Sequence, residues 1–536
     1  MRRLSVALCL SLAVASPVRG QEEAEPGAQD WPTPGQLNGW FAPTTPAQAG
    51  EYLSDLADAF DMVELDTLAW VDGGSVEPDS ALPVLLAGVR RPPSGEDRRL
   101  RVLVLSGQGG DDLSGTEVSL QIIRELVLGE IGDLLDALDL AFVPASNPWG
   151  LLWWVPDEPS GVDPTRDHSR LLSPATTAVH DLVNTWRPHL VVEMREIGPM
   201  VYRVQSGLPK HPNVDPDLAA YGRFYLLPYV ANELARASVT FREYVAVGPA
   251  SEGLQTSLQG AEALPEGAYL TPGHLGADRA GNAFSLAGSL SVMLGAASLG
   301  GADGLSERVQ LLYQSLGYLL EVAANQAEGL LNWSAEAPKV LSLRHDWVRD
   351  EEQPDLVWLV WNDRGRIVQQ TTDRWRSVIR RKLVLPVPAA WVIEPTGSEW
   401  ATLVTAHGFE IERLSRKEVL EVGSYPVGAV SMLPAELGSG LPRDSAPDGS
   451  NLLVRGEREF PAGAWIVRAS QPGVRLLFTV IEPWSQDAPL GRESPPGGTP
   501  GGIEMYPVHR IEVGTSLESL RTEPAEPGGV RAGPAD

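Results

Sequence analysis

Cysteine is almost absent from this sequence. Cys9 is the one cysteine among 536 residues, and it lies in a short apolar stretch near the start of the chain. The rest of the chain can therefore form no disulfide bond and offers no thiolate ligand to a metal ion. Disulfide-stapled folds and cysteine-ligated metal sites are excluded.

Basic residues are also scarce. The chain has 42 Lys and Arg against 70 Asp and Glu, which gives a formal net charge of −28. A surface of this sign repels the phosphate backbone of nucleic acids, so nucleic acid is not expected as a partner. With 43% hydrophobic and 21% charged residues, the composition is otherwise that of a globular protein with a sizeable core.

Long apolar runs are missing as well. No segment reaches the roughly 18 apolar residues that a membrane-spanning helix needs, so the chain is not expected to cross a membrane. Two arginines followed by the short apolar run 4–14 are typical of a secretory signal. We therefore expect a signal peptide over 1–20, cut after Ala15 or Gly20, and a periplasmic or secreted protein.

The rest of the chain divides by composition. Strand-like and helix-like stretches alternate over 44–330, a pattern that predicts an α/β domain with a largely parallel sheet. Tryptophans become frequent and strands shorter over 335–513, which we interpret as a smaller C-terminal α+β domain. A flexible leader is expected over 21–43 and a disordered tail over 522–536.

Local patterns place the elements. The predicted strands are 101–106, 138–144, 189–194, 289–294, 389–394, 409–414, 464–469 and 475–482. The predicted helices are 115–135, 173–186, 215–237, 304–327 and 398–407. Ligand sites on parallel sheets lie at the carboxyl ends of strands, and Gly107–Asp112 and Arg195–Glu196 both follow or end such strands.

Four short motifs follow one another along the first part of the chain. They are Gly107-Gln-Gly-Gly-Asp-Asp112, Asn147-Pro-Trp-Gly150, Val162-Asp-Pro-Thr-Arg-Asp167 and Val191-Val-Glu-Met-Arg-Glu196. Their order resembles the carboxypeptidase A-like zinc metallopeptidases. The segments 461–467 and 481–485 are similar to the C-terminal extension of large bacterial members. The resemblance implies a three-layer αβα domain around a mixed, largely parallel sheet.

In that family zinc is held by a His-x-x-Glu pair after the first strand and by a third histidine that ends a later strand. The matching positions here are Gly109, Asp112 and Arg195. Glycine has no side chain, and a guanidinium has no lone pair for a metal ion. The resemblance therefore implies a lost zinc site, and we predict no cofactor.

The family's general base is also missing. The stretch Arg279–Leu286 matches the approach to the base-bearing strand, and Gly295 stands where the glutamate would be. No acidic residue occurs between Asp278 and Asp303. The resemblance thus implies that no side chain takes the catalytic base position.

Arg166 and Thr165 match the arginine and asparagine that grip a substrate's terminal carboxylate in the family. Arg166 has two interpretations: a carboxylate clamp, or a structural ion pair with Asp163 or Asp167. The neighbouring His168 is expected to be an exposed polar residue rather than a metal ligand.

Arg195 supports a further hypothesis. Its guanidinium can take the place of the metal ion and pair with Asp112, which would compensate a buried carboxylate. The alternatives are that Arg195 points to solvent or pairs with Glu193 or Glu196.

These observations predict an exported pseudo-peptidase that binds peptide C-termini, cell-wall peptide or a protein partner. Two alternatives stay open. The first is an active zinc metallocarboxypeptidase that uses Asp112 with Asp111, Glu193 or Glu196 as an acidic metal site. The second is a purely structural domain.

Overall fold

The computed structural model describes residues 31–77, 79–91, 98–198, 201–248, 267–297, 304–361, 366–427, 448–490, 505–515, 517–518 and 520–525. The predicted signal peptide 1–20, the first part of the predicted leader and the last part of the predicted tail lie outside these residues. Among the described residues, no helix combines the length and the apolar character that a membrane crossing requires.

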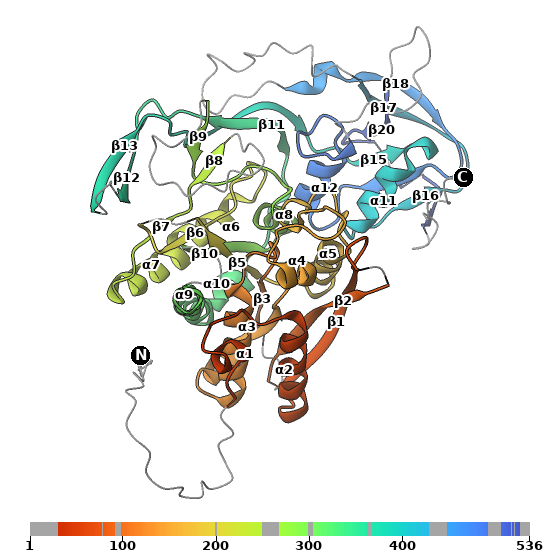
Figure 1. The fold of residues 1–536 in the computed structure, drawn as a ribbon. Coiled ribbons are helices and arrows are strands. Elements are labelled where there is room, and N and C mark those ends of the chain that lie inside the picture. Colours follow the sequence, from red (N-terminus) through yellow and green to blue (C-terminus); the bar gives the residue numbers. More distant parts are fainter. Residues whose placement is uncertain are drawn as a thin grey trace, which may run out of the picture. The chain divides into compact units, whose positions relative to one another are not determined.

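A mixed sheet forms the first part of the molecule (Figure 1). Within the described residues its eight strands run in the order β1-β2-β4-β3-β5-β10-β6-β7. Their bounds are β1 Val63–Asp72, β2 Ala81–Val89, β3 Leu100–Leu105, β4 Leu138–Val143, β5 Leu190–Ile197, β6 Val204–Gly207, β7 Phe241–Glu243 and β10 Leu290–Ala297. A separate pair joins β8 Ala246–Gly248 and β9 Tyr269–Thr271.

The centre of this sheet is parallel. Strands β4, β3, β5 and β10 pair in parallel, whereas β1, β2 and β6 join their neighbours β2, β4 and β10 in antiparallel pairs. The central strands are short, nearly continuous apolar runs because both of their faces are covered. In the β5–β10 register, Arg195 lies opposite Gly295.

Helices cover both faces of the sheet. Their bounds are α1 Pro34–Leu37, α2 Pro46–Ala59, α3 Ser114–Leu128, α4 Pro148–Trp153, α5 Pro174–Trp186, α6 Pro216–Tyr221, α7 Leu227–Arg236, α8 Ala280–Ala287, α9 Leu305–Asn325 and α10 Ala327–Leu331. Figure 1 shows α3 beside α9, with α5 and α8 across β5 from them.

The two helix layers use opposite faces of β5. A side chain at Gly115 of α3 would meet Met194, whereas Val191 packs with α5 and with Phe284 of α8. Successive strand residues point to opposite faces. The arrangement is therefore a three-layer αβα fold around a mixed, largely parallel sheet, and the predicted fold class is confirmed.

The second part contains a further sheet. In the described residues its strands run in the order β18-β17-β20-β15-β19-β16-β21, and each pair is antiparallel. The elements of this part are β11 Val340–Val348, β12 Leu356–Trp361, β13 Ile367–Thr372, β14 Val378–Pro386, β15 Ala390–Ile393, α11 Ser398–Ala406, β16 Glu412–Leu414, β17 Glu418–Pro426, β18 Val454–Phe460, β19 Trp465–Arg468, α12 Val474–Ile481, β20 Met505–Ile511 and β21 Thr522–Pro524. The predicted α+β character of this part is confirmed.

One predicted strand is wrong. Residues 475–482 were expected to form a strand, but they fall in and just after α12, which begins after Gly473 at φ 76°. Phe478 and its apolar neighbours in α12 are buried in the core. A short apolar run that is buried on all sides has no periodicity by which a strand can be distinguished from a helix.

Parts of the expected leader and tail are also folded. In the leader, Thr33 and Gln36 cap α1 reciprocally, and Arg124 of α3 donates to the Gln36 side chain at 2.7 Å. In the tail, β21 pairs with β16. Capping and main-chain pairing order these short segments without any apolar pattern in their sequence.

One core cluster joins the two parts. Ala277 and Leu286 pack in the same cluster as Trp391, Trp400 and Phe478. Because their buried surfaces are shared, the described residues from Thr33 onward form one compact unit. The predicted domain boundary between 330 and 335 stays a prediction.

Candidate functional site

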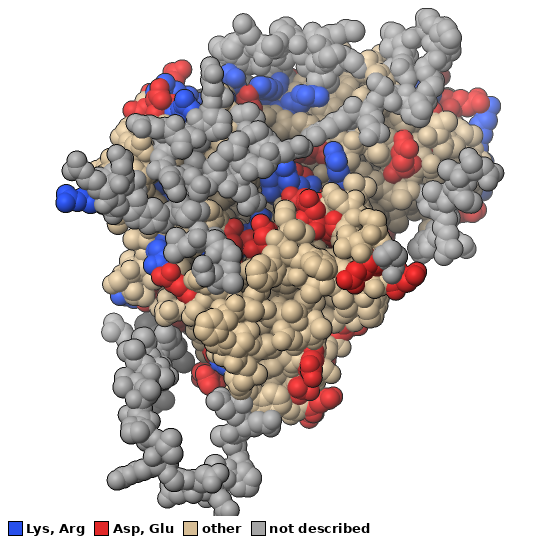
Figure 2. Space-filling model, in the orientation of Figure 1, with Lys and Arg blue, Asp and Glu red and all other residues tan. Residues whose placement is uncertain are grey.

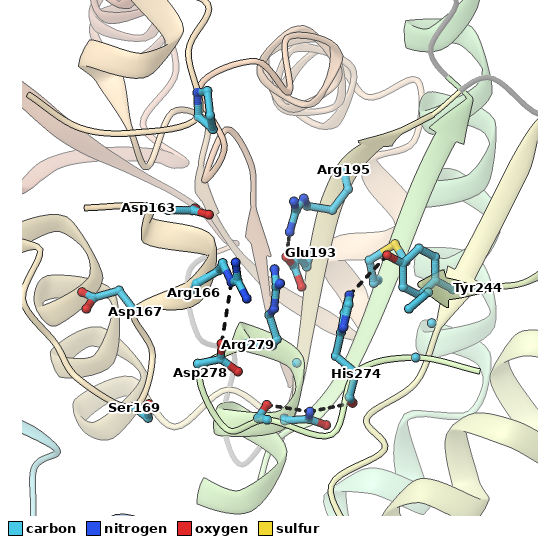
Figure 3. Close-up of a pocket in the computed structure, with 18 of the residues that line it drawn as sticks. Asp163, Arg166, Asp167, Ser169, Glu193, Arg195, Tyr244, His274, Asp278 and Arg279 are labelled. Carbon is cyan, nitrogen blue, oxygen red and sulfur yellow. Dashed lines mark hydrogen bonds and ion pairs between the residues drawn. The ribbon is translucent and has the colours of Figure 1, made fainter. Parts of the chain in front are cut away.

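Strands β5 and β10 line a cavity of about 1240 Å³. Four arginines line it, Arg166, Arg170, Arg195 and Arg279, together with carboxylates from several segments. Figure 2 shows basic and acidic side chains next to one another near the middle of the drawn face. Figure 3 shows the cavity residues themselves. The cavity lies at the carboxyl end of β5, which Glu193, Arg195 and Glu196 line, as expected for a site on a parallel sheet.

The predicted ion pair between Arg195 and Asp112 is confirmed. Arg195 Nε lies 2.8 Å from Asp112 Oδ2, and Arg195 Nη1 donates to Glu193 Oε1 at 3.0 Å. The side chains of Arg195 and Asp112 are only 14% and 6% exposed. The backbone N–H of Glu196 donates to Asp112 Oδ1 at 2.6 Å. The Asp112 carboxylate therefore has a close partner on each oxygen.

Gly109 faces the same carboxylate. A Cβ placed at Gly109 would lie 2.9 Å from Asp111 Oδ1 and 3.2 Å from Asp112 Oδ2. Position 109 is thus aimed where a ligand beside Asp112 would need to be, but it has no side chain. Gly109 offers no donor atom, Arg195 is a cation, and the Asp112 carboxylate is already paired with Arg195. The residues at these positions do not fit a zinc ion, which needs several lone-pair donors.

Several buried carboxylates lie close together around Asp112 and Arg195, a region that we call the strand-end corner of the cavity. Burial raises the pKa of the Asp112 carboxyl to about 7; Arg195 lowers this pKa, and the charges of Asp111 and Glu196 raise it further. Burial lowers the pKa of the Arg195 guanidinium, but the Asp112 and Glu193 carboxylates raise it by more, so the net shift of this pKa is upward. Glu196 has its own partner, Arg308, at 2.9 Å. The corner is a network of internal ion pairs.

The predicted position of the missing base lies on the cavity side of β10. A Cβ at Gly295 would meet Ile197 Cγ2 at 2.9 Å and Met293 Sδ at 3.3 Å. Ser291 and Met293 of the same strand line the cavity. Strand β10 therefore contributes no carboxylate to the cavity wall, and the assignment of Gly295 to the base position stays a prediction.

Arg166 reaches the cavity from η2 Pro164–Arg166. Neither of the structural partners expected for it is its partner: Asp163 accepts from Thr165 N and Oγ1 at 2.9 and 2.6 Å, and Asp167 accepts from backbone N–H groups just before α5. Arg166 Nε instead lies 3.9 Å from Asp278 Oδ2 (Figure 3). At 39% exposure and with this one distant carboxylate, its guanidinium is available to a ligand.

Sequence reasoning missed Arg279. It stands at the N-cap of α8 and lines the cavity, with its Nη1 3.5 Å from Thr165 Oγ1. Nearby, Tyr244 Oη lies 3.5 Å from His274 Nε2. The sequence signal was present, since Arg279 directly precedes an apolar helix, but nothing local showed that it would face Arg166.

The expectation that His168 is exposed is wrong. His168 is 1% exposed, with Nε2 2.7 Å from Gln108 Oε1 and Nδ1 3.1 Å from His180 Nε2. Its ring also packs on Phe284 of α8. Burial lowers the pKa of His168 to about 3, so the imidazole is neutral at physiological pH. The polar residues beside His168 in the sequence suggested an exposed loop, whereas the loop packs this side chain against α8.

Among the described residues, one cluster has a donor set that a metal ion can use. The donor atoms of His211, His345 and Asp487 lie within 4.8 Å of one another, and all three residues are buried. The backbone N–H of Asn213 donates to His211 Nδ1 at 3.1 Å, which assigns the proton of the neutral ring to Nε2, 3.1 Å from Asp487 Oδ2. Metal-ligating histidines usually donate their other ring N–H outward. His211 is instead arranged as a hydrogen-bond donor to Asp487.

Fold and motif order thus define a carboxypeptidase-like α/β protein. No protein-family model matches the chain. Carboxypeptidase 2 of Trichophyton tonsurans is 20% identical over 449 residues, which are 80% of this chain and 78% of the relative. Carboxypeptidase 2 of Trichophyton rubrum is 21% identical over the same shares of both chains. The chain is thus similar to curated carboxypeptidases over most of its length.

Solved structures show partial likeness. The superposition on a metallo-carboxypeptidase from Pseudomonas aeruginosa covers 54% of this chain and 71% of that chain, at 18% identity and a TM-score of 0.38. Carboxypeptidase A from Helicoverpa armigera covers 54% and 75%, at 14% identity and a TM-score of 0.38. The similarity to carboxypeptidases rests on the curated relatives and the motif order, not on these scores.

Proposed function

We propose that this protein is an exported pseudo-peptidase, which binds the C-terminal carboxylate of a peptide and does not cleave it. The observation that carries the proposal is the contact of 2.8 Å between Arg195 Nε and Asp112 Oδ2. A divalent ion between these atoms would have to displace a buried guanidinium and would meet its positive charge at short range. Without an ion at this corner, no hydroxide nucleophile forms there.

Arg166 supports the binding half of the proposal. Its planar guanidinium suits two parallel hydrogen bonds to a carboxylate, and its present partner Asp278 lies 3.9 Å away. Thr165 holds the loop in place through Asp163 rather than reaching the ligand with its hydroxyl. The ligand is a peptide terminus, from a free peptide, a cell-wall peptide or a protein partner.

Matched peptides test the binding. We expect the purified full chain to bind short peptides with a free C-terminal carboxylate and to bind the same peptides poorly when they are amidated, as measured by calorimetry. Arg166→Gln removes charge-assisted hydrogen bonds of about 1.5–3 kcal/mol, which corresponds to roughly 10- to 100-fold weaker binding. The control Arg90→Gln changes an exposed pair with Glu64 away from the cavity and should leave affinity unchanged.

The alternatives predict other results. An active metallocarboxypeptidase with an acidic site at Asp112 would trim C-terminal residues in a chelator-sensitive way. A structural domain would bind neither the free nor the amidated peptides, and Arg166→Gln would change nothing.

Export is part of the proposal and is supported by the N-terminal charge and apolar pattern. Intact-mass analysis of the protein recovered from outside the cytoplasm should show a new N-terminus after Ala15 or Gly20. Recovery of a chain that still begins at Met1 would contradict it.

A further inference from the structure

Three of the four arginines that line the cavity proposed to hold the peptide terminus lie close enough to influence one another. Figure 3 shows Arg166, Arg195 and Arg279 directed into the same space from different segments. They influence one another: burial lowers the pKa of Arg279, and the charges of Arg195 and Arg166 lower it further. The neutral imidazole of His274 experiences all three charges. Like charges in a low-dielectric cavity require anions as partners.

The arginines differ in how well they are compensated. Arg195 has two close carboxylates, at 2.8 and 3.0 Å. Arg166 and Arg279 share the charge of Asp278, which lies 3.9 Å from Arg166 Nε. Among the described residues, no carboxylate comes within ion-pair distance of the Arg279 guanidinium, whose one hydrogen-bond acceptor is the Thr165 hydroxyl at 3.5 Å. Arg279 is therefore the least closely compensated of these three guanidinium groups.

The backbone adds positive character beside Arg279. Helix α8 begins directly after Arg279 and has no side-chain cap. Its first N–H groups have no partner inside the helix and carry the positive end of the helix dipole. Gly281 and Asn282 of this first turn line the cavity. The Asn282 side chain fixes the surrounding loops by donating to His274 O and Gly276 O and accepting from Lys210 N.

We propose that the ligand ends in an acidic residue, so that it offers two carboxylates. The terminal carboxylate binds Arg166, and the side-chain carboxylate binds Arg279 at the start of α8. A helix N-terminus with a guanidinium beside it is a favourable place for an anion. This inference rests on the proposed function, because it assigns a substrate class to the same cavity: peptides with C-terminal glutamate or aspartate.

The test compares peptides that differ at one functional group. Two peptides of identical sequence end in Glu or in Gln, both with a free terminal carboxylate, and a third ends in amidated Glu. The wild-type chain should bind the Glu peptide roughly 10-fold or more tightly than the Gln peptide, since one charge-assisted contact is added. Arg279→Gln should abolish this preference and leave the Gln peptide's affinity within about twofold.

The variants separate the inference from the function on which it rests. Arg166→Gln should weaken both free-carboxylate peptides, whereas Arg279→Lys, which keeps the charge, should retain part of the preference for Glu. Equal wild-type affinity for the Glu and Gln peptides would overturn the inference and leave the proposed function standing. Equal weakening of both peptides by Arg279→Gln would also overturn it, because Arg279 would then share the terminal carboxylate. If none of the peptides binds wild type, the proposed function itself fails. Thermal unfolding of each variant confirms that it is folded.

Discussion

The arginines at two corners of one cavity differ in how closely carboxylates pair with them. At the strand-end corner, Arg195 is held by Asp112 and Glu193 and is nearly buried. At the other corner, Arg166 and Arg279 share one carboxylate that lies at the limit of ion-pair distance from Arg166. At the first corner the guanidinium and the two carboxylates compensate one another's charge, and the guanidinium occupies the space beside Asp112. The second corner keeps the Arg166 guanidinium available to an anionic ligand.

The largest effect on stability should come from removal of the Arg195 ion pairs at the strand-end corner. Arg195→Ala leaves the buried Asp112 and Glu193 carboxylates without their cation, and removal of one partner from such a pair costs about 3–5 kcal/mol. Chemical denaturation should show this as a lower unfolding free energy. The control Arg90→Ala breaks a pair with Glu64 whose side chains are 55% and 63% exposed, and should change stability by at most about 1 kcal/mol. Equal losses in the two variants would show that the Arg195 pair is not special.

The pH dependence of stability sharpens the comparison. The pKa of Asp112 is raised from 3.8 to about 7 in the folded state, so its contribution to stability is fully present below pH 3.8 and is lost as the pH rises through 7. The slope is at most about 1.4 kcal/mol per pH unit in that window. Asp112→Asn should remove this slope, as measured by denaturation at several pH values.

The matched control for that experiment is Asp136→Asn, which changes an exposed carboxylate paired with Arg91. This variant should keep the wild-type slope. If Asp112→Asn follows the wild-type pH profile as well, the strand-end corner does not titrate in this range.

The smallest effect on stability belongs to the open corner. Arg166→Gln removes a half-exposed guanidinium whose partner is 3.9 Å away, and should change the unfolding free energy by no more than about 1 kcal/mol. Its effect should appear in peptide binding instead. A loss of stability close to that of Arg195→Ala would mean that Arg166 is a structural residue, as its alternative interpretation holds.

Much of the first part was predictable because its signals are local. Short apolar strands followed by glycines, and the motifs around Gly109, Asp112 and Arg195, lie in segments whose order predicts the sheet. The Arg195–Asp112 pair could be predicted because both residues occupy positions that a family resemblance brings together at strand ends. The resemblance implied which strands lie next to one another, and therefore which strand-end residues meet.

The remainder depended on contacts between distant segments. His211, His345 and Asp487 are far apart in the chain and meet only because the two parts share a core. Arg279 became a candidate site residue only because it lies near Arg166, which belongs to a different segment. His168 is buried by the packing of its loop against α8, and α12 is a helix because of what surrounds it. No periodicity or motif encodes such contacts.

Metal analysis of the purified full chain beside Asp112→Asn tests the central claim most directly. A metal that remains in both proteins would belong elsewhere, for instance at the His211 cluster. We predict that no zinc in the wild-type protein depends on Asp112, so the two proteins carry the same amount. One zinc per wild-type chain that disappears in Asp112→Asn would contradict an internally satisfied strand-end corner.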